Sequence, residues 1–124
     1  MTAPWPRELK VSAARDLLTI EFDNGETVRL SAEYLRVESP SAEVQGHGPS
    51  QRTTVGGKRA VRIENLEPVG NYAVRILFSD GHDSGLYSWD WLYRLAREHD
   101  RLWPAYLSAL TAKGLSRDEP GGRT

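Results

Sequence analysis

Two segments of the sequence follow the same plan, and this repetition constrains the fold more than any other feature. Residues 18–35 read LTIEFDNGETVRLSAEYL, and residues 74–92 read VRILFSDGHDSGLYSWDWL. Each contains an alternating strand, a turn with a glycine, a second strand, a serine and the aromatic start of a helix. The match is short and requires a gap, so it reflects shared local physics and does not establish a duplication. It predicts two β-hairpins, each of which leads into a helical segment.

The first hairpin is indicated by alternation on both sides of a strong turn signal. Strands are expected at 17–22 and 27–30, separated by the sequence Asp-Asn-Gly, because Asn and Gly tolerate the positive φ angles of tight hairpin turns. Ser31 can then cap a short helical turn at 32–36. The residues expected to face inward are Leu18, Ile20, Phe22, Val28 and Leu30.

The second hairpin is expected to lie beside one further strand. The pattern predicts strands at 60–64 and 72–79, a turn at Asp80-Gly81, and a short returning strand at 85–87. One face of the longest strand is apolar, and it carries Val74, Ile76 and Phe78.

Two helices are expected toward the end of the chain. Ser88 can cap a helix at 89–100, where apolar residues recur at helical spacing. A last helix is expected from Pro104 to Gly114, because proline is favoured in a first turn and glycine is favoured just after a last one.

These elements predict an α+β domain. A small antiparallel sheet built from the two hairpins would pack with helices near 88–100 and 104–113. Residues 1–114 are expected to form a single domain with an irregular start over 1–7, and the polar tail 115–124 is expected to be disordered.

Composition excludes several classes of function. The 124 residues contain no cysteine, which rules out disulfides, thiolate zinc sites and cysteine catalysis within this chain. The net charge of −1 gives no general attraction to nucleic acid or to an anionic membrane. No apolar run approaches the length of a membrane span, and the N-terminus lacks the apolar region of a secretory signal. We therefore expect a soluble, cytoplasmic, bacterial-type protein.

Candidate functional side chains are densest around the turn of the second hairpin. They are Asp80, His82, Asp83, Ser84, Tyr87, Ser88 and Trp89. A histidine beside an aspartate can ligate a metal, act as a base, form a buried hydrogen bond or simply face water in a turn, and the turn context favours water. No Walker loop, HExxH, GxGxxG or Ser–His–Asp order is present.

The polar segment 37–60 is long for a loop in a compact domain, and long ordered loops are often functional. The carboxylates of Glu38 and Glu43 and a histidine at position 47 could join His82 as oxygen and imidazole ligands, although their spacing does not require a metal site. His47 lies between two glycines, which is typical of a solvated loop histidine. The glycine-rich basic run at 56–59 could contact a phosphate, but a flexible loop is the simpler interpretation.

Four aromatic residues fall within seven positions: Tyr87, Trp89, Trp91 and Tyr93. On a helix, Trp89 and Tyr93 share a face, and Trp91 points elsewhere. Most of the cluster is expected to pack on the sheet, while an exposed tryptophan would suit a protein interface.

The sequence resembles the gamma-butyrobetaine hydroxylase-like N-terminal domain family. The residues that carry the resemblance are Trp5-Pro6 through Leu9, FDNGETVRLSAEYLR and SDGHDSGLYSWDWLYRL, and the similarity covers roughly residues 5–112. In the eukaryotic hydroxylases of the family, a motif LR-x-x-C-P-C-x-x-C and the histidine of a later DGH turn bind a structural zinc. The resemblance maps those cysteines onto Ser39, Ser41 and Val44 and the histidine onto His82.

The resemblance therefore implies a stand-alone bacterial member with a degenerate zinc site and no bound metal or cofactor. A neutral hydroxyl is a poor zinc ligand, and valine is none. We expect a hydrogen bond from Ser39 or Ser41 to His82 to hold the loop to the second hairpin in place of the metal, and we expect residues 43–58 to be the most mobile internal part.

The resemblance also suggests a function. In the hydroxylases this domain precedes an iron- and 2-oxoglutarate-dependent oxygenase domain, for which 124 residues leave no room, and related domains are fused to Mrp-type ATPases that carry iron–sulfur clusters. We expect an accessory or protein-interaction domain without catalytic activity of its own, monomeric or weakly dimeric, with an unknown protein partner. The alternative is a small-ligand or metal-binding module centred on His82 and the 37–58 loop, with iron–sulfur or oxygenase proteins as the partners that the resemblance suggests. The candidate binding residues are Arg36, His47, His82, Asp83, Tyr87, Trp89 and Trp91.

Overall fold

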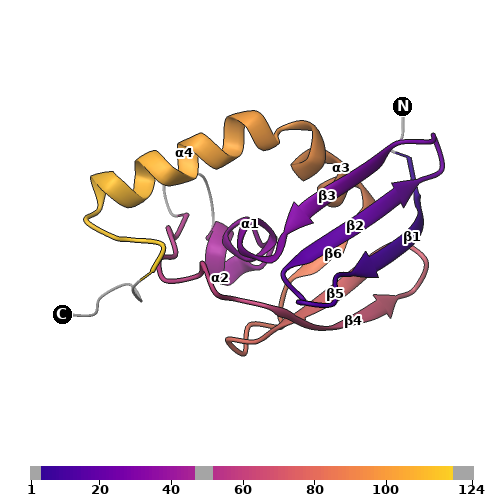
Figure 1. Ribbon diagram of the computed structural model, residues 1–124, viewed down its shortest axis with the longest axis horizontal. Coiled ribbons are helices and arrows are strands. Elements are labelled where there is room, and N and C mark those ends of the chain that lie inside the picture. Colours follow the sequence, from indigo (N-terminus) through magenta and orange to yellow (C-terminus); the bar gives the residue numbers. More distant parts are fainter. Residues whose placement is uncertain (1–3, 47–51, 119–124) are drawn as a thin grey trace.

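The computed structural model describes residues 4–46 and 52–118, which form two three-stranded antiparallel sheets and four helices (Figure 1). The strands are β1 (Pro6–Val11), β2 (Leu17–Phe22), β3 (Thr27–Ser31), β4 (Ile63–Val69), β5 (Ala73–Phe78) and β6 (Leu86–Ser88). The helices are α1 (Ala32–Val37), α2 (Ala42–Gln45), α3 (Trp89–Arg97) and α4 (His99–Ala112). Within these ranges, no helix combines the length and the apolar character needed to cross a membrane.

The first sheet has the order β1-β2-β3 and contains the first predicted hairpin. Alternate residues of β2 are buried, as the period of two requires. The tight turn between β2 and β3 places Gly25 at a φ of 90°, a conformation that side chains other than glycine rarely adopt. The prediction of an irregular start was wrong for residues 6–7, because β1 begins at Pro6 and pairs along β2.

The second sheet has the order β4-β5-β6 and repeats the turn of the first. The amide of Phe22 donates to the carbonyl of Glu26 at 2.8 Å, and the amide of Phe78 donates to the carbonyl of His82 at 3.0 Å. In the first hairpin the strands pair again directly after the turn, at Thr27. In the second hairpin, pairing resumes only at Leu86. Residues 82–85 are thereby released from the ladder.

One hydrophobic core joins the two sheets. The apolar side chains of β2 and β3 belong to the same buried cluster as those of β4 and β5, and Figure 1 shows the sheets lying one behind the other. The α+β class is confirmed, and each hairpin acquires its own extra strand, β1 or β4, instead of sharing one sheet. β4 starts at Ile63 and not at residue 60, because residues 60–62 lie outside the pairing with β5.

Serine caps begin both helices that follow the hairpins, as predicted. The hydroxyl of Ser31 accepts a hydrogen bond from the amide of Tyr34 at 3.0 Å, and that of Ser88 accepts one from the amide of Trp91 at 3.1 Å. Such caps satisfy amides that have no partner within the helix. The hydroxyl of Tyr34 then donates to the carbonyl of Leu95 at 2.6 Å, which fastens α1 to α3.

The expected start of the last helix at Pro104 was wrong. α3 ends at Arg97 and α4 begins at His99, so Pro104 lies inside α4. The break occurs at Glu98, whose carbonyl accepts from the amides of Arg101 at 3.0 Å and Leu102 at 2.8 Å. Pro104 lies early in the helix and gives up one bond of the ladder.

The first part of the tail is ordered, contrary to the prediction of disorder over 115–124. Leu115 packs against the cluster formed by Val37 and α4. Arg117 reaches Glu33 of α1 with two hydrogen bonds, of 2.8 and 2.7 Å, and Glu33 is buried. Arg59 pairs with Asp118. Residues 119–124 lie outside the described residues.

Candidate functional site

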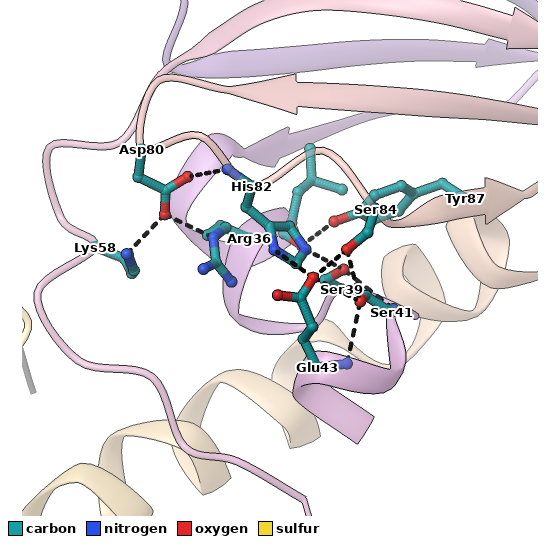
Figure 2. A network of polar contacts seen from close by, with 10 residues as sticks. Arg36, Ser39, Ser41, Glu43, Lys58, Asp80, His82, Ser84 and Tyr87 are labelled. Carbon is teal, nitrogen blue, oxygen red and sulfur yellow. Dashed lines mark hydrogen bonds and ion pairs between the residues drawn. The ribbon is translucent and has the colours of Figure 1, made fainter. Parts of the chain in front are cut away.

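Two segments that are far apart in the sequence meet at one polar cluster (Figure 2). The first is the chain after α1, which contains Ser39 and the α2 cap Ser41. The second is the released stretch 82–85 of the second hairpin, which contains His82 and Ser84. Because this stretch is freed from the β-ladder, its side chains can turn toward the loop.

The centre of the cluster is a contact between Ser39 and His82. The Ser39 hydroxyl oxygen lies 2.9 Å from Nε2 of His82, and the same hydroxyl accepts from the amide of Ser41 at 3.2 Å. This confirms the predicted hydrogen bond between the loop and the hairpin. Ser39 is 0% exposed. A Cβ atom added to Gly85 would come within 2.5 Å of the Ser39 hydroxyl, so the hairpin backbone closes over it.

A second set of contacts runs beside the first. The hydroxyls of Ser41 and Ser84 are 2.9 Å apart, and Ser84 also donates to the carboxylate of Glu43. The Glu43 carboxylate lies 3.8 Å from Nδ1 of His82. The hydrogen bond from Ser84 is the main cause that lowers the pKa of Glu43. The carboxylate is therefore ionised at neutral pH.

Charged groups fix the other side of the turn. Asp80 accepts from Arg36 Nε at 2.8 Å, from Lys58 Nζ at 2.7 Å and from the amide of His82 at 3.0 Å. Burial raises the pKa of Asp80, but the bonds from Lys58, His82 and Arg36 outweigh it and lower that pKa to about 2. Arg36 Nη1 is buried without a hydrogen-bond partner among the residues that the structure describes.

His82 is held in its neutral form. Burial, followed by the positive charge of Arg36, lowers its pKa, while the carboxylates of Glu43, Asp80 and Asp83 oppose that shift. A neutral imidazole can exchange a hydrogen bond with the Ser39 hydroxyl without burying a charge. The geometry therefore suits a structural contact at neutral pH.

The order Ser39, His82, Glu43 superficially matches the nucleophile, base and acid of a hydrolase. A nucleophilic serine must present its hydroxyl to a substrate and to the donors of an oxyanion hole. The Ser39 hydroxyl has no exposed surface and lies under Gly85. A substrate could not reach it unless the loop and the hairpin separated.

The cluster is also a poor metal site. In the part of the chain that the structure describes, no group of three His, Cys, Asp or Glu side chains is placed to hold a metal. Glu38 turns away from the cluster and forms an ion pair with Arg52 at 2.8 Å. Val44 is buried in α2. His47 lies outside the described residues.

The remaining candidate residues do not converge on one site. Tyr87 is buried, and its hydroxyl donates to the carbonyl of Leu35 at 2.6 Å. Trp91 is partly buried, and its Nε1 donates to the carbonyl of Glu38 at 3.0 Å.

Three further candidates also lie apart from one another. Trp89 lies at the end of the hairpin away from the turn, and Asp83 is exposed to solvent. Arg36 is buried in the ion pair with Asp80, so it is not an accessible binding group.

A cavity of about 420 Å³ lies beside α4, and it was not predicted from the sequence. The residues lining it are Glu38, Arg52, Thr54, Arg101, Leu102, Ala105, Tyr106, Ala109 and Lys113. One signal was available in the sequence. Four lining residues are spaced four positions apart between Arg101 and Lys113, which places them along one helix face. Nothing local indicated that Glu38 and Arg52 would face them.

The fold and the site define a small α+β domain in which a loop and an opened hairpin are joined by hydroxyl, imidazole and carboxylate groups. The sequence model described as "Gamma-butyrobetaine hydroxylase-like, N-terminal" matches residues 9–93, more than half of the chain. The chain belongs to this family, as the resemblance indicated. Among curated proteins, none matches the chain significantly.

Solved structures agree with this assignment. Two solution structures determined by NMR each give a TM-score of 0.80. One is 43% identical, covering 99% of this chain and 98% of that chain, and the other is 49% identical, covering 94% and 90%. A crystal structure of a protein of unknown function from Acidithiobacillus ferrooxidans, assigned to the DUF971 family, is 36% identical, with a TM-score of 0.60 and coverages of 73% and 91%.

Proposed function

We propose that this chain is a cytoplasmic accessory domain without catalytic activity of its own, and that it acts by binding a protein partner. The observation that carries the proposal is the exposure of two large apolar side chains, Tyr72 just before β5 and Leu86 in β6. We call these two residues and the half-buried Trp89, which follows β6, the β6-edge surface. Tyr72 is 55% exposed and Leu86 is 46% exposed, and Trp5, at 49%, is the other large apolar side chain with such exposure among the residues that the structure describes.

The β6-edge surface is held in place from behind. The amide of Trp89 donates to the carbonyl of Tyr72 at 3.2 Å, and its indole Nε1 donates to the carbonyl of Asn71 at 2.8 Å. Leu86 is in register with Arg75 on the neighbouring strand. Aromatic side chains that are already ordered lose little entropy when a partner covers them, and such residues dominate binding energy at protein interfaces.

The enclosure of the Ser39 hydroxyl supports the non-catalytic part of the proposal. The enclosed hydroxyl of Ser39 is bonded to His82, and the Glu43 carboxylate accepts from Ser84. Their role in the proposal is to hold the loop to the second hairpin. The partner classes suggested by the family resemblance, oxygenases and iron–sulfur carrier ATPases, are the first to test.

Site-specific photo-crosslinking in cells tests the partner. A photoreactive amino acid is placed at position 86, and a matched one at the exposed position 10 of β1 serves as the control. We expect a discrete heterologous adduct from position 86, none from position 10, and loss of the adduct when Tyr72→Glu is added. Adducts of similar yield from both positions, or a product at twice the mass of the chain alone, would contradict a dedicated heterologous partner.

Metal binding at the polar cluster is the second candidate function, because the family resemblance places a zinc site at these positions. We propose that the site is degenerate, because a hydroxyl at position 39 contacts His82 and a second hydroxyl at position 41 bonds to Ser84, and hydroxyls are poor zinc ligands. Native mass spectrometry of the untagged protein with added zinc tests this, with Ser39→Cys/Ser41→Cys/Val44→Cys as the positive control. We expect one zinc in the variant and none in the original chain. Stoichiometric zinc in the original chain would overturn the proposal.

A further inference from the structure

We infer that the cavity beside α4 is a binding site for a small organic anion. This site is separate from the β6-edge surface, and the inference does not depend on the proposed protein partner. Its volume of about 420 Å³ falls in the range of small-molecule sites. One wall is a face of α4, and the other contains Glu38, Arg52 and Thr54.

The α4 wall carries cations at its two ends and small residues in the middle. Arg101, Ala105, Ala109 and Lys113 follow one another at intervals of four, so they form one stripe on the helix. Twelve residues of helix span about 18 Å. The two alanines leave open space between the cations, and Leu102 and Tyr106 add apolar surface beside the stripe. This arrangement suits an elongated ligand with an apolar middle.

The opposite wall is fixed by an ion pair between the half-buried Arg52 and the buried Glu38. Arg52 Nη2 lies 2.8 Å from the Glu38 carboxylate, and Arg52 also donates to the carbonyl of Val37 at 3.2 Å. Tyr106 crosses between the walls, and its hydroxyl donates to the carbonyl of Val55 at 2.6 Å. The cavity is therefore supported by contacts between α4 and the chain around residues 52–55, which pre-organise it.

The lining carries more cationic than anionic side chains, which favours an anionic ligand. Three of its side chains are cationic and one, Glu38, is a carboxylate. Glu38 is paired with Arg52, and Arg101 is also bound by Glu98 from outside the cavity. Arginine and lysine bind carboxylate and phosphate groups by charge-assisted hydrogen bonds. An organic acid with one or two such groups matches the charges and the apolar floor together.

Titration with glutarate, a short dicarboxylate, tests the site by ¹H–¹⁵N NMR on the full chain. We expect saturable shifts confined to residues that line the cavity. Ala109→Leu fills the cavity without changing charge, and leucine is a good helix former, so this variant should fold and bind at least about fivefold more weakly. Ala105→Leu provides a second filling variant if the first fails to fold. Arg101→Gln/Lys113→Gln should weaken binding by at least about fivefold.

The matched charge control is Lys10→Gln, which removes an exposed cation from β1. Its affinity for glutarate should stay within about twofold of the original chain. The inference fails if no saturable shift occurs up to about 10 mM glutarate. It also fails if both filling variants, once shown to be folded, bind as tightly as the original chain, or if Lys10→Gln weakens binding as much as the double variant. Either of the last two results would mean that the anion binds to cationic side chains on the surface in general and not specifically in the cavity.

Discussion

The hydroxyl oxygen of Ser39 lies 2.9 Å from Nε2 of His82, although 43 positions separate the two residues. The contact joins the chain after α1 to the released stretch of the second hairpin. It is buried, so water does not replace it when it is lost. The energetic consequence of each substitution here depends on which buried group is left without a partner.

Ser39→Ala should destabilise the domain by about 2 kcal/mol, because it leaves the imidazole of His82 and the amide of Ser41 without this partner in a buried setting. The matched control is Ser84→Ala. Ser84 is exposed, so water can satisfy the groups it leaves, and the cost should be below about 0.5 kcal/mol. Urea denaturation measures both. Equal losses would show that burial does not determine the strength of these contacts.

The pKa of His82 predicts a loss of stability in mild acid. Burial lowers that pKa below the ordinary value of 6.5, so the unfolded chain binds a proton more readily than the folded one. The free energy of unfolding should therefore fall as the pH drops through about 6.5 toward the folded pKa. His82→Gln keeps a polar partner for Ser39 and removes the titration. Urea denaturation at several pH values between about 7.5 and 5.5 should give a smaller decrease for His82→Gln than for the original chain. Parallel curves would contradict the prediction.

Arg52→Gln should destabilise the domain by about 3 kcal/mol at neutral pH, because it leaves the buried carboxylate of Glu38 unpaired. Burial already raises the pKa of Glu38, and Arg52 opposes that shift. Without Arg52 the pKa of Glu38 rises further. The Glu38 carboxyl then takes up a proton in the folded state as the pH falls, and the unpaired buried charge is removed. The deficit should be largest at neutral pH and should shrink as Glu38 takes up a proton.

The double variant Glu38→Gln/Arg52→Gln supplies the control for this pair. It removes both charges, so it should recover much of the stability lost in Arg52→Gln at neutral pH. Thermal denaturation of the single and double variants across the pH range tests the coupling. A double variant as unstable as Arg52→Gln at every pH would indicate lost packing in place of an unpaired charge.

Truncation of the C-terminal segment should depend on where the chain is cut. Removal of residues 115–124 takes away both Leu115 and Arg117 and leaves Glu33 buried without its bidentate partner, so it should cost about 3 kcal/mol. Removal of residues 119–124 retains those contacts and should change the unfolding free energy by less than about 0.5 kcal/mol. Thermal denaturation of the two truncated chains measures the difference. Equal stability would mean that the Arg117 contacts contribute nothing.

Features that depend on neighbouring residues could be predicted from the sequence. The alternation in β2 and β5, the glycines of the two hairpin turns, and the caps at Ser31 and Ser88 are all encoded within a few positions. The start of the last helix was predicted wrongly at Pro104, because the preference of proline for a first turn is only a tendency. The helix already begins at His99, where the carbonyl of Glu98 accepts from the amides of Arg101 and Leu102.

Features that depend on distant pairs could not be predicted in the same way. Glu33 and Arg117 are 84 positions apart, and neither carries a local sign of the other. β1 is an edge strand whose partner is set by tertiary structure. The contact between Ser39 and His82 was expected only because the family resemblance placed those positions together. Neither the resemblance nor a local sequence pattern indicated the contacts of residues 115–118 or the cavity between Arg52 and α4.

The close approach of Gly85 to Ser39 limits the evolutionary routes open to this domain. A side chain at position 85 would collide with the hydroxyl of Ser39. A residue larger than glycine at position 85 therefore requires the stretch 82–85 or the Ser39 side chain to move first.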